Sequence, residues 1–128
     1  MMKKRKKPFV VTHGSYPFDV MVCIGTTHAE VIKALNKKMG RKMDKEEADY
    51  LELHSIGRTV MLDGGQTILM AEDLKNNPDF HANLSHEILH AVSFLFDRVG
   101  LPHTTQGDEA WAYQVGHLTR EIYKHLYA

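Results

Sequence analysis

The most informative residues of this chain are two histidines four positions apart with a glutamate directly after the first: His86, Glu87 and His90. In an α-helix, positions i and i+4 lie about 40° apart around the axis and one turn apart along it. Both imidazoles can therefore point at one metal ion, with zinc as the expected metal. Glu87 is placed to take a proton from a metal-bound water instead of binding the metal.

The alternative reading is an accidental pair of surface histidines. From the frequencies of His and Glu in this chain, the pattern would arise by chance about 0.04 times. Apolar residues at helical spacing, among them Leu84, Ile88 and Val92, indicate a largely buried helix, so we expect both histidines and Glu87 to face a cleft. A buried glutamate without a partner is costly, and a metal-bound water or a substrate would supply one.

A zinc site of this kind needs a third protein ligand and an open fourth position. A histidine six residues after the second one is a common third ligand, but Phe96 stands there. A glutamate from a following helix is another solution, and Glu109 lies nineteen residues after His90. Asp108 and His103 remain alternative ligands. Glu109 would also stabilise the dipole of its helix if it bound no metal.

The helix that carries the two histidines has clear ends in the sequence. We expect it to run from Pro78 to about Val99, because Asn77 can cap it and proline suits a first helical position. Gly100 can end it in the left-handed conformation.

A last helix is expected from the capping-box pattern of Thr105 and Asp108 to the C-terminus. The break at 100–106 would let this helix fold back antiparallel to the motif helix. Ala112 and Gly116 form a strip of small residues where the two helices could approach closely. This arrangement would bring the first turn of the last helix towards the metal.

The first half of the chain reads as a strand, two short helices and a hairpin. The strand is predicted by alternating apolar residues, the helices by two capping boxes, and the hairpin by a glycine pair between two β-rich runs. These signals lie at 18–24 for the strand, at Thr27 with Glu30 and Asp44 with Glu47 for the helices, and at 59–62 and 67–71 for the hairpin. We therefore expect an α+β fold with a small antiparallel sheet packed on helices.

Composition is that of one ordinary globular domain, with 43% hydrophobic and 25% charged residues in 128. Residues 1–7 hold five of the sixteen positive charges and are expected to form a solvated tail before a single domain at 8–128. Nucleic-acid binding would rest on this tail alone, so we do not expect it. The longest apolar stretches are too short to span a membrane. Cys23 has no second cysteine to pair with, which favours a reducing, cytoplasmic location.

The order His-Glu-x-x-His, a short break, then Asp-Glu-Ala-Trp-Ala-Tyr at 108–113 resembles a minimal gluzincin-type zinc metallopeptidase. It is similar to small phage and prophage metallopeptidases over roughly residues 78–126. The resemblance implies a zincin-like fold with one Zn²⁺ per chain held by His86, His90 and Glu109, and Glu87 as general base. The hairpin then takes the place of the active-site sheet, and a phage-encoded protein would act in the host cytoplasm.

Weaker expectations concern residues around this motif. Tyr113 lies one turn after Glu109 and is a candidate for stabilising an oxyanion, with packing between helices as the alternative. His81 and His117 are expected to be hydrogen-bonded histidines and not ligands.

The expected partner is a protein or peptide substrate, which could pair with an exposed hairpin strand at 67–71. The rival hypothesis is a zinc-bearing binding module without turnover. Glu87 favours the enzyme, because a docking module has no need for a base beside the first ligand.

Overall fold

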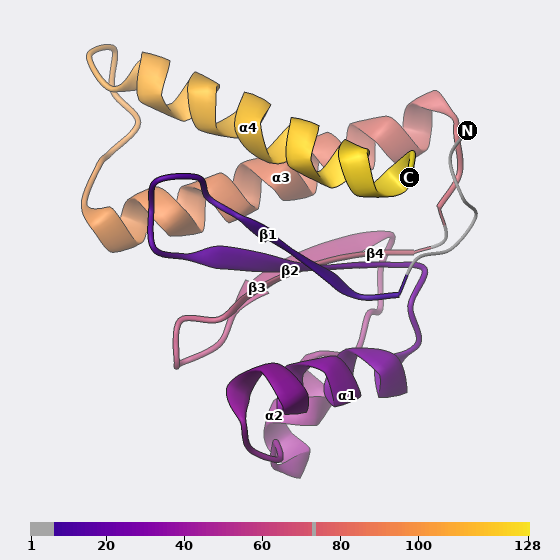
Figure 1. The fold of residues 1–128 in the computed structure, drawn as a ribbon. Helices are drawn as coiled ribbons and strands as arrows, with labels where there is room; N and C mark the ends of the chain where they lie inside the picture. The colour runs from indigo at the N-terminus through magenta and orange to yellow at the C-terminus, as the bar shows by residue number, and fades with distance from the viewer. Residues whose placement is uncertain (1–6, 73) are drawn as a thin grey trace.

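Four strands form one sheet with helices on both of its faces (Figure 1). The structure, a computed structural model, describes residues 7–72 and 74–128. Most of the predicted basic tail therefore lies outside the described residues. The elements in chain order are β1 (Phe9–Thr12), β2 (Asp19–Ile24), α1 (His28–Met39), α2 (Lys45–Tyr50), β3 (Gly57–Met61), β4 (Thr67–Ala71), α3 (Pro78–Val99) and α4 (Asp108–Leu126).

The sheet is mixed, with strand order β1-β2-β4-β3. The antiparallel sheet expected from the sequence is therefore wrong in one respect, because β2 and β4 are parallel, with Val22 beside Leu69. The chain between them passes through α1, α2 and β3, which is the long crossover that parallel neighbours require. β1 and β3 are the edge strands. β4 is central and buried along its whole length.

Two hydrophobic cores cover the two faces of the sheet. Along β2 and β4 the side chains alternate, so that Val22 and Leu69 join one core while Cys23 and Met70 join the other. The first core lies under α3 and α4, and the second lies under α1 and α2 (Figure 1). Strands covered on both faces read as continuous apolar runs, which is why their pairing was hard to predict from alternation.

The motif helix α3 begins and ends where the sequence predicted. The Asn77 side chain accepts a hydrogen bond from the Phe80 main-chain N–H (2.9 Å), and Gly100 adopts a φ of 75°. The capping boxes of α1 and α2 are also confirmed. The helix α2 is short and ends at Tyr50. These helix ends depend on capping residues next to them in the chain, so they can be predicted from the sequence.

The start of α4 differs from the prediction. Thr105 and Asp108 form no capping box, because α4 begins at Asp108 after Gly107, which has no side-chain cap. Instead Thr104 Oγ1 accepts a hydrogen bond from the Gly107 main-chain N–H (3.1 Å), and Asp108 bonds to His103. The short strand β1 was not predicted. In the described part of the chain, no helix is long and apolar enough to cross a membrane.

Candidate metal centre

α3 brings His86 and His90 together on its solvent side. Their Nε2 atoms lie 3.1 Å apart, and both residues are exposed. Two nitrogen ligands at about 2.0–2.1 Å from a tetrahedral zinc ion are about 3.3 Å from each other. The two ring nitrogens therefore already have nearly the separation that one shared ion requires. Both histidines are exposed, so the burial expected for them is not observed.

Glu87 turns away from the histidine pair and towards the sheet. One residue along a helix is about 100° around its axis, so Glu87 points at β3 while His86 faces solvent. Glu87 is only 5% exposed. Thr59 Oγ1 lies 2.7 Å from Glu87 Oε1 and 3.2 Å from the Glu87 main-chain oxygen. The partner expected from a substrate or bound water is therefore supplied by the protein.

Gly57 lies against the same carboxylate. A Cβ atom at this position would be 2.9 Å from Glu87 Oε2 and 3.1 Å from Glu87 Cγ. Because Gly57 has no side chain, the carboxylate of Glu87 can lie against the edge strand β3. Sequence reasoning missed both Gly57 and Thr59. Each is an ordinary hairpin residue, and nothing in the sequence pairs them with a helix residue almost thirty positions later.

The free edge next to this carboxylate belongs to β3. The expectation that strand 67–71 would pair with a substrate is wrong, because β4 has a neighbour on each side. Hydrogen bonds from Glu72 N to Ile56 O and from Leu62 N to Gln66 O show that the even-numbered residues of β3 face β4. Main-chain groups alternate in direction along a strand, so those of Thr59 and Met61 face the open edge.

A pocket of about 430 Å³ lies along the first turns of α3, next to Ile56. Asn83, one turn before Glu87, lines it together with Ile56 and Phe80. The pocket therefore lies between the first turns of α3 and the residue that precedes β3.

Glu109 is exposed in the first turn of α4. Across residues 7–72 and 74–128, no group of three or more His, Cys, Asp or Glu side chains is arranged to hold a metal, so Glu109 does not join the histidine pair. The reason is the register of the two helices. Trp111 packs on Phe96 with ring centroids 5.1 Å apart. Phe96 lies about 9 Å along the α3 axis from His90.

The two alternative ligands are bonded to each other at this same end of α3. His103 Nε2 lies 2.7 Å from Asp108 Oδ1, and the His103 ring stacks on Trp111 at 4.8 Å. Trp111 also donates from Nε1 to the Leu101 main-chain oxygen (3.2 Å). The loop between the helices is thus tied to α4 and not to the histidine pair.

The remaining predicted residues lie outside the histidine pair. Tyr113 is 71% exposed, so it does not pack between the helices, and its role in stabilising an oxyanion stays a prediction. His81 bonds to the Tyr123 hydroxyl at 2.5 Å, and His117 bonds to the Thr12 main-chain oxygen at 3.0 Å. Both are hydrogen-bonded histidines, as expected.

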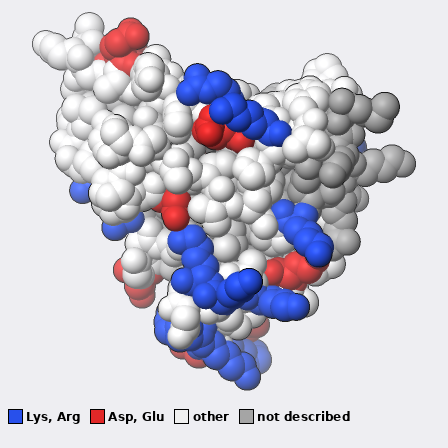
Figure 2. Space-filling view, in the orientation of Figure 1, with Lys and Arg blue, Asp and Glu red and all other residues white. Residues whose placement is uncertain are grey.

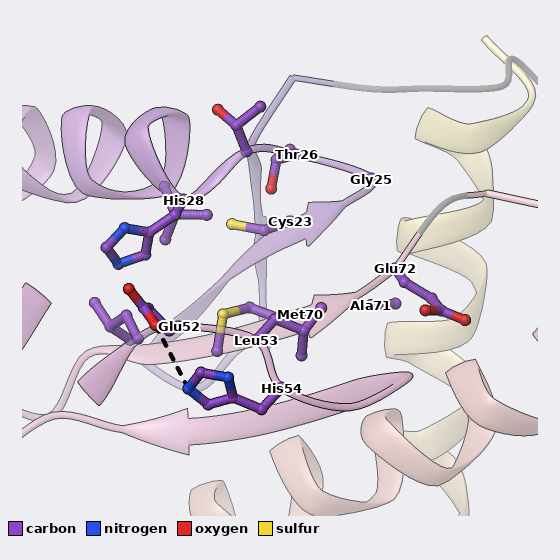
Figure 3. Close-up of a pocket in the computed structure, with 13 residues that line it drawn as sticks. Cys23, Gly25, Thr26, His28, Glu52, Leu53, His54, Met70, Ala71 and Glu72 are labelled. Carbon is purple, nitrogen blue, oxygen red and sulfur yellow. Dashed lines mark ion pairs between the residues drawn. The ribbon is translucent and has the colours of Figure 1, made fainter. Parts of the chain in front are cut away.

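A second cluster of polar side chains lies under α1, at the carboxyl ends of β2 and β4 (Figure 3). It lines a pocket of about 490 Å³. His54 forms an ion pair with Glu52 at 3.5 Å, and His28 Nε2 bonds to the Ala48 main-chain oxygen at 2.6 Å. Burial raises the pKa of the Cys23 thiol to about 12, so this cysteine is held as a neutral thiol and not as a nucleophile.

Charge is divided unevenly along the chain. Residues 1–45 carry eleven Lys and Arg against three Asp and Glu, whereas residues 46–128 carry five against thirteen. Figure 2 shows Lys and Arg side chains gathered low in the view, where Figure 1 places α1 and α2. Residues 28–50, which include α1 and α2, nevertheless hold five Asp and Glu beside six Lys and Arg, so the net charge of this side is close to zero.

Comparison with known proteins adds no further constraint on this site. No family model matches the chain, and neither the curated proteins nor the solved structures give a significant match.

Proposed function

We propose that this chain is a zinc-dependent peptidase with His86 and His90 as two of the metal ligands and Glu87 as the general base. The observation that carries the proposal is the 3.1 Å separation of the two ring nitrogens on one face of α3. A bound zinc ion would supply a Lewis acid and a water of lowered pKa. The resemblance to gluzincin-type metallopeptidases supports the same assignment.

Glu87 has one carboxylate oxygen available for proton transfer. Thr59 engages Oε1, whereas Oε2 lies beside Gly57 at the edge of the sheet. A general base must stand within hydrogen-bond reach of the proton that it removes. Because Gly57 has no side chain, a substrate or a water at the edge of β3 can approach Oε2.

The substrate class follows from the free edge of β3. An extended peptide can pair with the outward main-chain groups of Thr59 and Met61 by strand addition. This pairing would lay the peptide beside the residues that contact the base. The pocket near Asn83 and Ile56 would then receive a side chain from one end of the peptide. A protein or peptide with an accessible extended segment is the substrate we infer.

The third metal ligand stays a prediction. Glu109 would have to move along α3 towards His90 to complete the site, and the contact of Trp111 with Phe96 opposes such a shift. His103 and Asp108, the alternatives, are held by their mutual bond at the same end of α3. A cytoplasmic location likewise stays an expectation that rests on the single cysteine.

A binding module without turnover is the second candidate, and the position of Glu109 favours it. Two exposed histidines without a third ligand can still bind a metal weakly or share one with a partner. Thr59 also gives Glu87 a structural role that needs no catalysis. A measurement of peptide hydrolysis distinguishes the peptidase from the binding module.

The deciding experiment compares zinc-loaded wild type with Glu87→Gln on a broad peptide library, with metal content measured in both. The peptidase proposal expects retained zinc in the variant and hydrolysis at least about 100-fold slower, because the positioned base is lost. His54→Ala serves as a control, since His54 is an exposed histidine in the other pocket. A zinc-loaded wild type that cleaves nothing would support the binding module.

A further inference from the structure

The side chain of Glu87 is fixed by the hairpin strand β3 and not by its own helix. Two residues of β3 on the side that faces α3 contact it, namely Gly57 and Thr59. We propose that Thr59 is the positioning residue of Glu87, and that position 57 must be glycine because the carboxylate occupies the space of a side chain. The catalytic consequence of this placement rests on the proposed peptidase function.

Thr59 holds Glu87 by two atoms at once. Its hydroxyl oxygen is 2.7 Å from the carboxylate and 3.2 Å from the main-chain oxygen of the same residue. The shorter distance marks the carboxylate as the main acceptor, as expected for a hydrogen bond to a charged group. A hydroxyl between the main chain and the end of the side chain fixes the direction in which the Glu87 side chain leaves α3.

Gly57 sets the other limit on the carboxylate. A Cβ there would meet Oε2 at 2.9 Å, Cγ at 3.1 Å and Cδ at 3.3 Å. Gly57 does not have a positive φ, so its backbone would accept alanine without strain. The cost of Gly57→Ala would therefore fall on Glu87, whose side chain would have to swing away from β3.

The two contacts leave the carboxylate with one bonded and one open oxygen. Oε1 is taken by the hydroxyl of Thr59, and Oε2 lies against Gly57, two residues before Thr59 on the same edge strand. The residue that would pair with the substrate is thus the same one that holds the base. The main chain of Thr59 would position the peptide, and its side chain would position the carboxylate of Glu87.

The first test measures the contact without any use of activity. In metal-free protein, Thr59→Val should raise the unfolding equilibrium constant by about 10-fold, because a hydrogen bond to a charged group is lost. In a Glu87→Ala background the same change should raise it less than about 3-fold. Thr67→Val, on the neighbouring strand, should act equally in both backgrounds. Equal effects of Thr59→Val in the two backgrounds would overturn the contact.

The second test measures the positioning of the base on a peptide that wild type cleaves. Thr59→Val and Gly57→Ala should each lower kcat by about 10-fold or more while KM stays within about 2-fold, and Thr59→Ser should recover most of the loss. Unchanged kcat in Thr59→Val would overturn the positioning role even if the contact is real. If wild type cleaves nothing, the peptidase function and the positioning role both fail, whereas the stability cycle still decides whether β3 holds Glu87.

Discussion

The ring of Trp111 packs on the ring of Phe96, and this contact decides which turn of α4 faces which turn of α3. The ring centroids are 5.1 Å apart, and Phe96 lies six residues beyond His90 towards the end of α3. Farther along, Tyr123 of α4 stacks on His81 with centroids 5.7 Å apart. With both ends of the helix pair in register, Glu109 stays near the end of α3.

The first prediction separates the metal ligands. His86→Ala and His90→Ala should each weaken zinc binding by more than about 100-fold, a larger loss than removal of an outer-shell partner causes. Zinc affinity is measured by competition with a chelator, and stoichiometry by elemental analysis. Glu109→Ala should match the histidine variants only if α4 shifts when metal binds. Full zinc occupancy in Glu109→Ala would reject this ligand and direct the search to Asp108 and His103.

Local chemistry in the sequence was enough to predict the helix that carries the motif. Asn77, Pro78 and Gly100 act within a few residues of the helix ends, and the structure places both ends accordingly. The histidine pair follows from the same helix, because four residues make one turn. The sequence was therefore enough to predict which residues share one face of this helix.

Contacts between distant segments were not predictable in this way. The parallel pairing of β2 and β4 depends on a crossover of more than forty residues, and their apolar runs do not show which neighbour each strand takes. The bond between Thr59 and Glu87 joins positions that no local pattern relates. The same holds for Trp111 and Phe96, whose contact keeps Glu109 away from the histidines.

The second prediction concerns pH and the buried His13. Burial, together with the nearby His117, lowers the pKa of His13 to about 4, while Asp19 acts in the opposite direction. Gln114 donates to the His13 main-chain oxygen (3.0 Å) and lies 3.2 Å from its Nδ1, which fits a neutral ring.

The sign of this effect is fixed by the unfolded state, in which His13 has its ordinary pKa near 6.5. The unfolded chain binds a proton more readily, so the contribution of His13 is full above pH 6.5 and is lost as pH falls towards 4. The total loss is on the order of 3 kcal/mol. Denaturant unfolding from pH 7 to pH 4 should show a steeper decline in wild type than in His13→Gln. Parallel curves for the two proteins would contradict this assignment.

The third prediction concerns the basic N-terminus. If residues 1–7 form a solvated extension, their deletion should leave the unfolding midpoint and the zinc content unchanged. The α1 side carries further lysines, such as Lys33 and Lys37, that have no acidic partner among the described residues. Without residues 1–7 the chain holds eleven Lys and Arg against sixteen Asp and Glu, so salt-dependent binding of DNA or RNA should be absent or weak in both forms. Strong binding that disappears with the deletion would show a nucleic-acid function that the tail supplies.

The last prediction tests whether a peptide pairs with the open edge of β3. Met61 presents its main-chain N–H to that edge, so Met61→Pro removes a donor for a substrate without removing a bond to β4. Val10 offers a matched control on β1. The hydrogen bond from His13 N to Phe18 O shows that the odd-numbered residues of β1 face β2, which leaves the Val10 N–H pointing outwards.

Both proline variants should fold, because proline is tolerated on edge strands whose N–H faces solvent. Met61→Pro should raise KM for a cleaved peptide about five-fold, which corresponds to the loss of one hydrogen bond of about 1 kcal/mol. Val10→Pro should leave KM unchanged, because β1 and β3 lie at opposite edges of the sheet. The helix α3, which carries the histidines, contacts β3. Circular dichroism and the unfolding midpoint check the fold of each variant. An equal rise in KM for both variants, or none for Met61→Pro, would mean that peptides reach Glu87 by another route than strand addition to β3.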